Sequence, residues 1–348
     1  MTEETSTESH LSVVMTTDQD EMAQTTGVTS SSSRGSAVYF ECFVVVIGVI
    51  GTAANGLVLY ALMASKQHKK QELIVNQNAL DLYSCLFLII TYGLKLANVP
   101  LTGSVGYWLC MLILNENLLW CGVSAAFLNL TLITIERYLK VVHAVWSKTN
   151  VRKWMIYSGM AFAWISGFVH QIPVAFESSA VINGACLGYV IWKNPTTGMA
   201  YVIFYFLISY VIVLVIFIFC YGKILVAIRR QARVMATHNP AGSSTAQIQS
   251  NKIQSNIIKT MILVCAFYAI AWLPENIYFL LMGLNLNLTF LDNAYYTVLS
   301  IAFLYICSNF CRHENGCLNA VQSCLYRLRM EDNGVRAHQF GRPQLSRN

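Results

Sequence analysis

Seven long apolar stretches dominate the sequence. They cover approximately residues 38–64, 73–98, 107–139, 153–175, 198–227, 255–282 and 291–312. About 20 apolar residues in a helix cross the roughly 30 Å hydrocarbon layer of a bilayer. Only helices and closed barrels satisfy their backbone polar groups in lipid, and barrel strands are about ten residues of alternating polarity. The sequence therefore predicts an all-α membrane protein, with a seven-transmembrane helix bundle over 37–312.

The composition supports a membrane protein and limits the classes of function. Hydrophobic residues make up 55% of the 348 residues and charged residues only 11%, whereas soluble proteins carry about 25% charged residues. The formal net charge of +6 raises the question of nucleic-acid binding. However, the basic residues form short clusters between the apolar stretches, which is typical of membrane proteins. We therefore expect a multi-pass protein of the plasma membrane, in contact with lipid and without a nucleic-acid partner.

The positions of lysine and arginine predict the orientation of the helices. The links after the first, third and fifth stretches and the C-terminal segment are basic, with Lys66, Lys69, Lys70, Lys140, Lys148, Arg152, Lys153, Arg229, Arg230, Arg233, Lys252, Arg327, Arg329, Arg336, Arg342 and Arg347. The N-terminal segment and the other links hold only Arg34 and Lys193. Because cytoplasmic loops are enriched in basic residues, we expect the N-terminus outside and the C-terminus in the cytoplasm.

The two ends of the chain differ from the apolar region. Residues 1–36 are rich in serine and threonine and contain six acidic residues and one base, Arg34. Such a segment cannot bury enough apolar surface to offset its ordering entropy, so we expect a disordered extracellular tail. It lacks the pattern of a removable signal peptide, so the first helix is expected to act as its own insertion signal. Residues 313–348 are the expected cytoplasmic tail.

Two covalent modifications are expected on the outer side. Most of the eleven cysteines lie in apolar stretches and are interpreted as packing residues. Cys110 and Cys186 both fall on the oxidising side, where a disulfide between them is permitted, and we predict this bridge. The N-terminal tail contains no asparagine, so the expected outer glycosylation site is Asn287, in the sequon Asn287-Leu-Thr289 before the seventh stretch.

Six stretches carry short motifs in a fixed order. The motifs are Gly51-Thr-Ala-Ala-Asn55, Asn76-Gln-Asn-Ala-Leu-Asp81, Thr134-Ile-Glu-Arg-Tyr-Leu-Lys-Val-Val-His143, Trp164 before Pro173, Tyr221, and Trp272-Leu-Pro274. In this order and at these depths they resemble the rhodopsin-like (class A) G-protein-coupled receptor family across about 270 residues. The resemblance implies a receptor that binds an extracellular ligand, activates heterotrimeric G proteins and has no cofactor.

Asp81 is an acidic side chain at mid-membrane depth, which requires partners in the bundle interior. The resemblance makes Asn55 its neighbour and a sodium ion a candidate ligand. Two positions oppose the ion: Ala126 stands where a hydroxyl usually helps, and Tyr305 stands where Asn or Ser is usual. We therefore favour a polar packing cluster without an ion.

The cytoplasmic end of the third stretch carries Glu136-Arg137-Tyr138. Glu136 and Arg137 can pair at the membrane edge, where the dielectric is low enough for pairing to matter. The resemblance implies that Arg137 is released on activation and meets the G protein, with Tyr221 helping to hold it. Many family members also lock this arginine with an acid on the sixth helix. The position here is Gln254, which predicts a weaker inactive state.

The sixth and seventh stretches carry the remaining activation motifs. Pro274 removes one backbone hydrogen bond and predicts a kink, and by resemblance Trp272 is a sensor at the floor of the ligand pocket. The seventh stretch ends Asn309-Phe-Cys-Arg-His313, where the family has Asn-Pro-x-x-Tyr. Asn309 matches, but the proline and tyrosine do not. A divergent or truncated receptor that is silent is therefore an alternative.

Single positions disfavour two ligand classes. Leu119 stands where amine receptors of the family carry Asp, and Phe303 where an opsin carries the retinal lysine. The candidate pocket residues in the outer half are Lys95, Glu116, Leu119, Glu275, Asn276 and Tyr295. A buried Glu275 requires a cation, either Lys95 or a basic group of the ligand. A short peptide and a small molecule fit such a pocket equally.

Two other classes of function are weaker alternatives. A transporter favours internal repeats and helices broken at mid-membrane, and we find no repeat and no broken stretch besides the sixth. A membrane enzyme requires a metal cluster or a set of nucleophilic residues, and His143, His170 and His313 are too scattered to form one. We therefore predict a receptor without catalytic activity.

Overall fold

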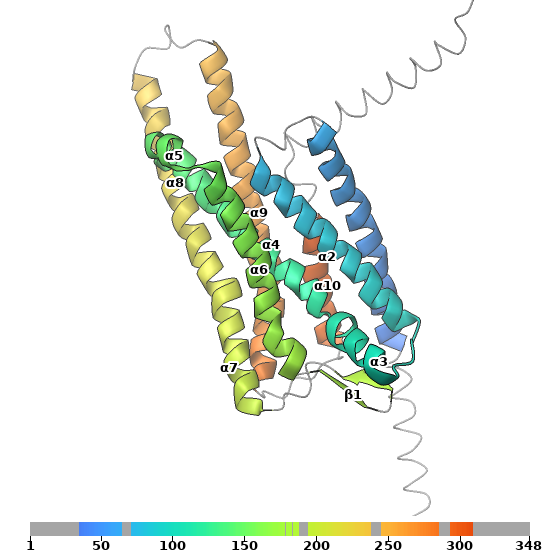
Figure 1. Ribbon diagram of the computed structural model, residues 1–348. Coiled ribbons are helices and arrows are strands. Elements are labelled where there is room, and N and C mark those ends of the chain that lie inside the picture. The colour runs from blue at the N-terminus through green and yellow to red at the C-terminus, as the bar shows by residue number, and fades with distance from the viewer. Residues whose placement is uncertain are drawn as a thin grey trace, which may run out of the picture.

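The computed structural model describes residues 35–64, 71–177, 179–182, 184–187, 194–237, 245–284 and 293–308. Within these residues, six helices are long and apolar enough to cross a membrane, and a shorter apolar helix follows at Asn293–Cys307. Figure 1 shows them side by side in one bundle. Two predicted site residues, Asn287 and Asn309, lie outside the described residues, as do most of the N-terminal tail and the whole predicted cytoplasmic tail.

The elements overlap the seven predicted stretches. In chain order they are the helix Gly35–Ala64, α2 (Glu72–Leu96), α3 (Gly103–Leu109), the π-helical turn η2 (Cys110–Leu114), α4 (Asn117–Val142), α5 (Ala144–Asn150), α6 (Lys153–Glu177), the strands β1 (Ala180–Ile182) and β2 (Ala185–Leu187), α7 (Pro195–Tyr205), the π-helical segment η3 (Phe206–Ile212), α8 (Val213–Thr237), α9 (Thr245–Gly283) and α10 (Asn293–Ser308). The fifth and sixth helices extend beyond the apolar residues because Ala, Gln, Lys and Arg are good helix formers.

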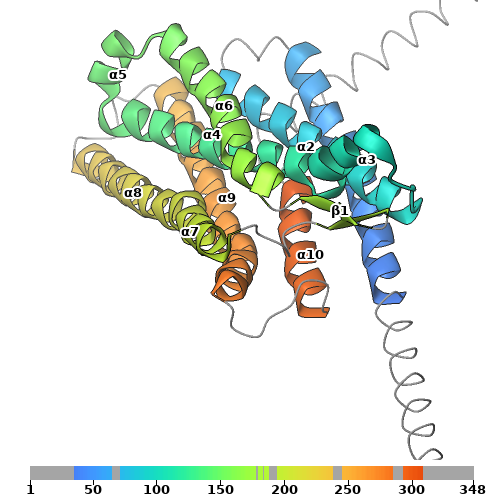
Figure 2. The same ribbon diagram turned by 60° about the horizontal axis from the view of Figure 1, so that its bottom comes forward.

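The bundle is organised around α4, which packs against α2, α6 and α8. The seventh helix, α10, packs against α9 and α2. Figures 1 and 2 place α3 and the β-hairpin at one end of the bundle and α5 at the other. The predicted outer and inner links therefore lie at opposite ends of the molecule.

Small residues bring α4 and α6 into close contact. A Cβ atom placed on Gly167 of α6 would lie 2.4 Å from the carbonyl oxygen of Cys121 and 3.0 Å from the Cβ of Ala125. Helices in lipid associate through such close backbone approaches, because lipid removes the hydrophobic driving force that operates in water. Gly167 therefore sets the spacing of these two helices.

The third span is broken at Asn115 and Glu116, between η2 and α4. Glu116 has a φ of 61°, in the left-handed region that a residue with a side chain adopts only when its surroundings compensate. The Asn115 amide donates a hydrogen bond to Ser179 Oγ at 2.6 Å, and the Glu116 N–H donates to the Ile113 carbonyl at 2.8 Å. This break corrects the expectation that only the sixth helix is interrupted.

The fifth span widens into a π-helix at η3, directly before Val213, although it contains no proline between Tyr201 and Tyr221. Two tyrosines join this segment to α9. Tyr268 donates its hydroxyl proton to the Ser209 carbonyl at 2.5 Å, and Tyr210 donates to the Ala269 carbonyl at 2.8 Å. The hydroxyl groups of these two tyrosines therefore hold the π-helical segment η3 against α9, in a span that has no proline.

The outer link after α6 forms an antiparallel hairpin in which Val181 pairs with Cys186. Cys186 is bonded to Cys110 of η2, with a Cα–Cα distance of 5.4 Å, so the predicted disulfide is confirmed. The bridge fixes the hairpin over the outer end of the third span. The Asn115–Ser179 hydrogen bond lies at the same junction.

Candidate functional site

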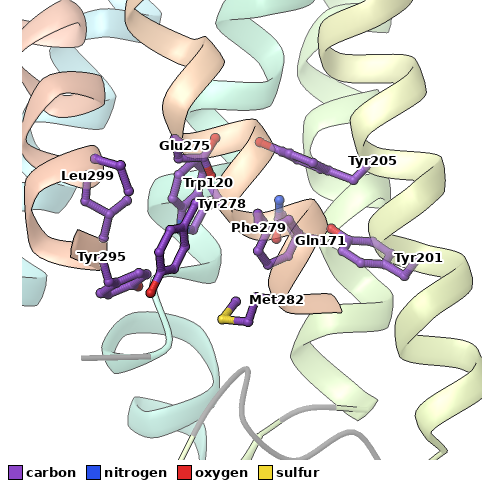
Figure 3. Close-up of a pocket in the computed structure, with 11 residues that line it drawn as sticks. Trp120, Gln171, Tyr201, Tyr205, Glu275, Tyr278, Phe279, Met282, Tyr295 and Leu299 are labelled. Carbon is purple, nitrogen blue, oxygen red and sulfur yellow. The ribbon is translucent and has the colours of Figure 1, made fainter. Parts of the chain in front are cut away.

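A pocket of about 520 Å³, including the open space at its mouth, lies between the helices. It is lined by Trp120 of α4, Gln171 of α6, Tyr201 and Tyr205 of α7, Glu275, Tyr278, Phe279 and Met282 of α9, and Tyr295, Val298 and Leu299 of α10. Figure 3 shows Glu275 and Met282 at opposite ends of this group, with aromatic rings between them.

Glu275 places a carboxylate in this pocket. It directly follows Pro274 in α9 and is 7% exposed. The side-chain amide of Asn276 donates a hydrogen bond to its Oε2 at 3.0 Å. Among the described residues, no lysine, arginine or histidine forms an ion pair with it. A buried carboxylate without a cation is unfavourable unless another group neutralises it.

Lys95 does not pair with Glu275. Of the two cations expected for that carboxylate, Lys95 or a basic group of the ligand, the first is therefore wrong. The Lys95 ammonium lies 2.6 Å from Glu116 Oε1 instead. Glu116 also accepts hydrogen bonds from Tyr92 at 2.8 Å and from the indole of Trp120 at 3.2 Å. The break in the third span turns the Glu116 side chain toward α2, so the two charges are satisfied inside the protein.

A second hydrogen-bond acceptor lines the pocket opposite α9. Gln171 of α6 is 4% exposed, and its Oε1 is buried and accepts no hydrogen bond from the described residues. Most of the remaining lining is aromatic or aliphatic. The pocket thus offers two acceptors, one of them a carboxyl group, in an apolar surrounding. This chemistry suits a ligand group that donates hydrogen bonds and carries a positive charge.

Of the six predicted pocket residues, Glu275 and Tyr295 line the cavity. Leu119 and Asn276 are buried behind it, and Lys95 and Glu116 form their own ion pair. The six did not include the other lining residues, Trp120, Gln171, Tyr201, Tyr205, Tyr278, Phe279, Met282, Val298 and Leu299. The spacing of Tyr201 and Tyr205 indicates that both lie on one helix face. They were missed because hydropathy alone does not show whether that face lines the pocket or contacts lipid.

A stack of aromatic rings continues from the pocket to the middle of the bundle. Trp120, at the pocket wall, lies 6.1 Å from Trp272, measured between ring centroids. Trp272 is fully buried and lies 4.7 Å from Phe127, which lies 5.1 Å from Tyr268. Pro274 lies inside α9 as predicted. Trp272 is therefore in a position to connect the pocket wall with the segment of α9 below the proline.

Asp81 and Asn55 are polar residues in the middle of the bundle. Asp81 is buried and accepts a hydrogen bond from the Gln77 amide at 3.1 Å. The Asn55 amide donates to the Gly51 carbonyl at 2.9 Å and contacts Cys85 Sγ at 3.9 Å. The described hydrogen bonds of Asn55 therefore go to Gly51 and Cys85.

The Glu136-Arg137-Tyr138 motif near the end of α4 does not form the pair that its sequence permits. Glu136 pairs with Lys140 at 2.6 Å rather than with Arg137. Residues four apart share a helix face, whereas adjacent residues point in different directions. The buried Nε of Arg137 has no hydrogen-bond partner among the described residues. Tyr221 shares a hydrogen bond with Thr134 at 3.3 Å, one turn before the arginine. Tyr138 packs against His143.

The comparison with protein families decides the class of this protein. A family model for the 7 transmembrane receptor (rhodopsin family) matches residues 54–312, most of the chain.

The chain belongs to the rhodopsin family of seven-transmembrane receptors.

Three curated relatives show how distant the similarity is. The chain is 22% identical over 280 residues to the Substance-K receptor of Mus musculus, covering 78% of this chain and 68% of the receptor. It is 25% identical over 243 residues to Galanin receptor type 1 of Mus musculus, covering 67% of this chain and 65% of the receptor. Galanin receptor type 1 of Homo sapiens is 25% identical over 244 residues, with the same two shares. The chain thus spans about two thirds of the length of these relatives.

Family membership fixes the fold and the broad function. The chain is a rhodopsin-like G-protein-coupled receptor with a seven-helix bundle and is a multi-pass protein of the plasma membrane. Members of this family are signalling receptors rather than enzymes. The predicted fold class and the resemblance on which it was based are therefore confirmed.

Proposed function

We propose that this receptor binds a short extracellular peptide that carries a basic group, and that it activates heterotrimeric G proteins. The observation that carries the proposal is Glu275, a buried carboxylate that lines the pocket without a cationic partner in the described residues. A guanidinium or ammonium group of the ligand would neutralise it and would also donate to Gln171. With the N-terminus outside, this pocket opens toward the extracellular fluid.

The two ligand classes left open by the sequence are a peptide and a small molecule, and the relatives favour the peptide. Their names assign them substance K and galanin as ligands, and both ligands are peptides. A peptide side chain fits the aromatic part of the pocket, and the β-hairpin held by the Cys110–Cys186 disulfide offers backbone groups beside its mouth.

The route to the G protein follows the ring stack and the kink. A ligand that moves Trp120 acts on the neighbouring ring of Trp272, which lies two residues before Pro274 in α9. A helix with a proline kink converts a small displacement above the kink into a larger one below it. The cytoplasmic ends of α8 and α9 then separate from Arg137, and the space between them receives the G protein.

The experiment uses cells that express the full chain and report second messengers. Short basic peptides and fractionated peptide extracts are applied first. An active peptide is then remade with citrulline or norleucine in place of each basic residue. We expect one replacement to reduce potency by about 30-fold or more, since truncating one partner of a buried charge pair costs roughly 2–5 kcal/mol.

The receptor variant Glu275→Gln provides the second half of a double-mutant cycle. It should reduce the potency of the basic peptide to the same degree and should leave the neutral analogue unaffected. Glu41→Gln, in the helix Gly35–Ala64, is the matched control because Glu41 does not line the pocket. Full potency in Glu275→Gln would contradict the charge pair. A chain that reaches the surface and never signals would support the silent receptor.

A further inference from the structure

Gln77 connects Asp81 to a line of hydrogen-bonded side chains that crosses three helices. The indole N–H of Trp164 in α6 donates to Asn76 Oδ1 at 3.1 Å. The Asn76 amide donates to Asn129 Oδ1 of α4 at 2.8 Å. The Asn129 amide donates to Gln77 Oε1 at 2.9 Å, and the Gln77 amide donates to Asp81 Oδ1 at 3.1 Å.

The two ends of this line impose one direction on every amide between them. The Trp164 indole nitrogen can only donate, and an ionised Asp81 carboxylate can only accept. Asn76, Asn129 and Gln77 must therefore each turn an oxygen toward Trp164 and an N–H toward Asp81. Hydrogen bonds aligned in this way polarise one another and strengthen the interaction at the carboxylate.

Gln77 owes its position to helix geometry. It lies four residues before Asp81 in α2, so the two side chains share a face, and both are 3% exposed. Asn129 fixes the far end of the glutamine, because its amide also donates to the Leu73 carbonyl at 3.0 Å. The Gln77 oxygen is thus bound by Asn129, and the Gln77 N–H group points at the Asp81 carboxylate.

The small cavity beside Asp81 does not suit a sodium ion, which the family resemblance makes a candidate there. A cation requires oxygen lone pairs, but the Gln77 oxygen is turned away toward Asn129. Ser84 supplies a hydroxyl oxygen to the lining, and its proton is donated to the Leu80 carbonyl of its own helix. Most of the remaining lining is apolar, with Val123, Ala126, Phe127, Leu130 and Ile306 beside Tyr305. Asn55 does not line this cavity, and its amide nitrogen contacts the Gly51 carbonyl and Cys85 Sγ.

We propose that the Gln77 amide takes the place of a bound cation at Asp81, so that this receptor holds its central carboxylate without sodium. The amide stabilises the negative charge with a hydrogen bond, and the line of donors back to Trp164 keeps it oriented. The packing of α2, α4 and α6 around Asp81 then becomes independent of the sodium concentration. This inference concerns the middle of the bundle and does not depend on the ligand proposed above.

The test measures the thermal unfolding midpoint of the purified full chain in sodium chloride and in N-methyl-D-glucamine chloride at equal ionic strength. A bound ion stabilises the folded state by mass action, so a chain that binds sodium unfolds at a higher temperature in sodium chloride. If the unmutated chain binds no sodium, it should unfold at the same temperature in both salts. Gln77→Leu should lower the midpoint by roughly 4 °C or more in both, because Asn129 and Asp81 each lose a buried hydrogen bond.

The variant Gln77→Glu should make the unfolding midpoint depend on sodium. It replaces the donor by a second carboxylate beside Asp81, so sodium should raise its midpoint by several degrees over N-methyl-D-glucamine. Asn78→Asp is the matched control: it adds a buried acid to the adjacent position of α2, where Asn78 hydrogen-bonds to the Ile74 carbonyl, and should show no preference for sodium. Stabilisation of the unmutated chain by sodium alone would overturn the proposal, as would an unchanged midpoint in Gln77→Leu.

Discussion

The ammonium nitrogen of Lys95 lies 2.6 Å from Oε1 of Glu116, across the junction of α2 with the broken third span. Glu116 has its backbone in the left-handed region at this break. The strained residue is therefore also the residue whose side chain is most fully paired, with Tyr92 and Trp120 as further donors. Since Trp120 forms part of the pocket wall, the ion pair holds one side of the pocket in place.

Removing the cation should destabilise the receptor more than removing the pair. Lys95→Met leaves the Glu116 carboxylate buried without its cation. The cost should approach, but not reach, the roughly 3–5 kcal/mol of a fully buried pair, because the Lys95 side chain is 27% exposed. We expect the unfolding midpoint of the purified chain to fall by about 4 °C or more. The double variant Lys95→Met with Glu116→Gln should recover most of this loss, and a double variant as unstable as the single one would contradict the argument.

The apolar stretches and the compartment of the cysteines were sufficient to predict the bundle and the Cys110–Cys186 bridge. The partners of the buried charges could not be predicted in this way. Lys95 meets Glu116 rather than Glu275 because the backbone turns at Glu116, and no propensity places a glutamate in a left-handed conformation. The four-residue spacing of Gln77 and Asp81 was visible in the sequence. The orientation of the Gln77 side chain depends on a hydrogen bond from Asn129, and this contact exists only because α4 packs against α2.

The close approach of α4 and α6 should not tolerate a methyl group. In Gly167→Ala the new Cβ lies 2.4 Å from the Cys121 carbonyl oxygen, so the helices must separate, at a cost of roughly 1–3 kcal/mol. Gly222→Ala in α8 is the matched control, because no atom lies within 4 Å of its Cβ position. It should be neutral or stabilising by up to about 1 kcal/mol. Thermal unfolding and surface expression of both variants measure the difference, and equal behaviour would refute the tight contact.

The π-helical segment η3 should depend on the hydroxyl of Tyr268. Tyr268→Phe keeps the ring stack but removes the donor to the Ser209 carbonyl. A buried acceptor left without its donor costs roughly 1–3 kcal/mol. We expect a lower unfolding midpoint, whereas Tyr60→Phe, at a ring that is 53% exposed, should leave the midpoint unchanged. If the two variants unfold at the same temperature, the hydroxyl does not hold the segment.

Glycosylation tests the orientation of the chain. Asn287 lies outside the described residues, and we predict that it carries the outer sugar because its sequon falls in a link assigned to the extracellular side. Treatment with an amidase that removes N-linked glycans should reduce the apparent mass of the unmutated chain. Asn287→Gln should already have the reduced mass and should not respond. A remaining amidase-sensitive shift in Asn287→Gln would show that the loop is misplaced.

Signalling without ligand is expected from the environment of Arg137. Glu136 is held by Lys140 rather than by the arginine, and the buried Arg137 Nε has no partner in the described residues. The sixth-helix position that locks this arginine in many relatives is Gln254, whose side chain lies outside the described part. An acid there would add a charge-assisted hydrogen bond of roughly 1.5–3 kcal/mol, reduced by nearby water.

Even about 1.4 kcal/mol changes the ratio of active to inactive receptor tenfold, so the unmutated chain should activate G proteins measurably without ligand. Gln254→Glu should lower this basal activity, and Arg137→Ala should abolish it. Lys140→Ala should change it less than twofold, because an exposed ion pair contributes little. The absent tyrosine after Asn309 acts in the opposite direction, since the family uses it to support the active state. If basal activity equals that of Arg137→Ala and Gln254→Glu has no effect, the altered end of the seventh helix dominates and the receptor is silent.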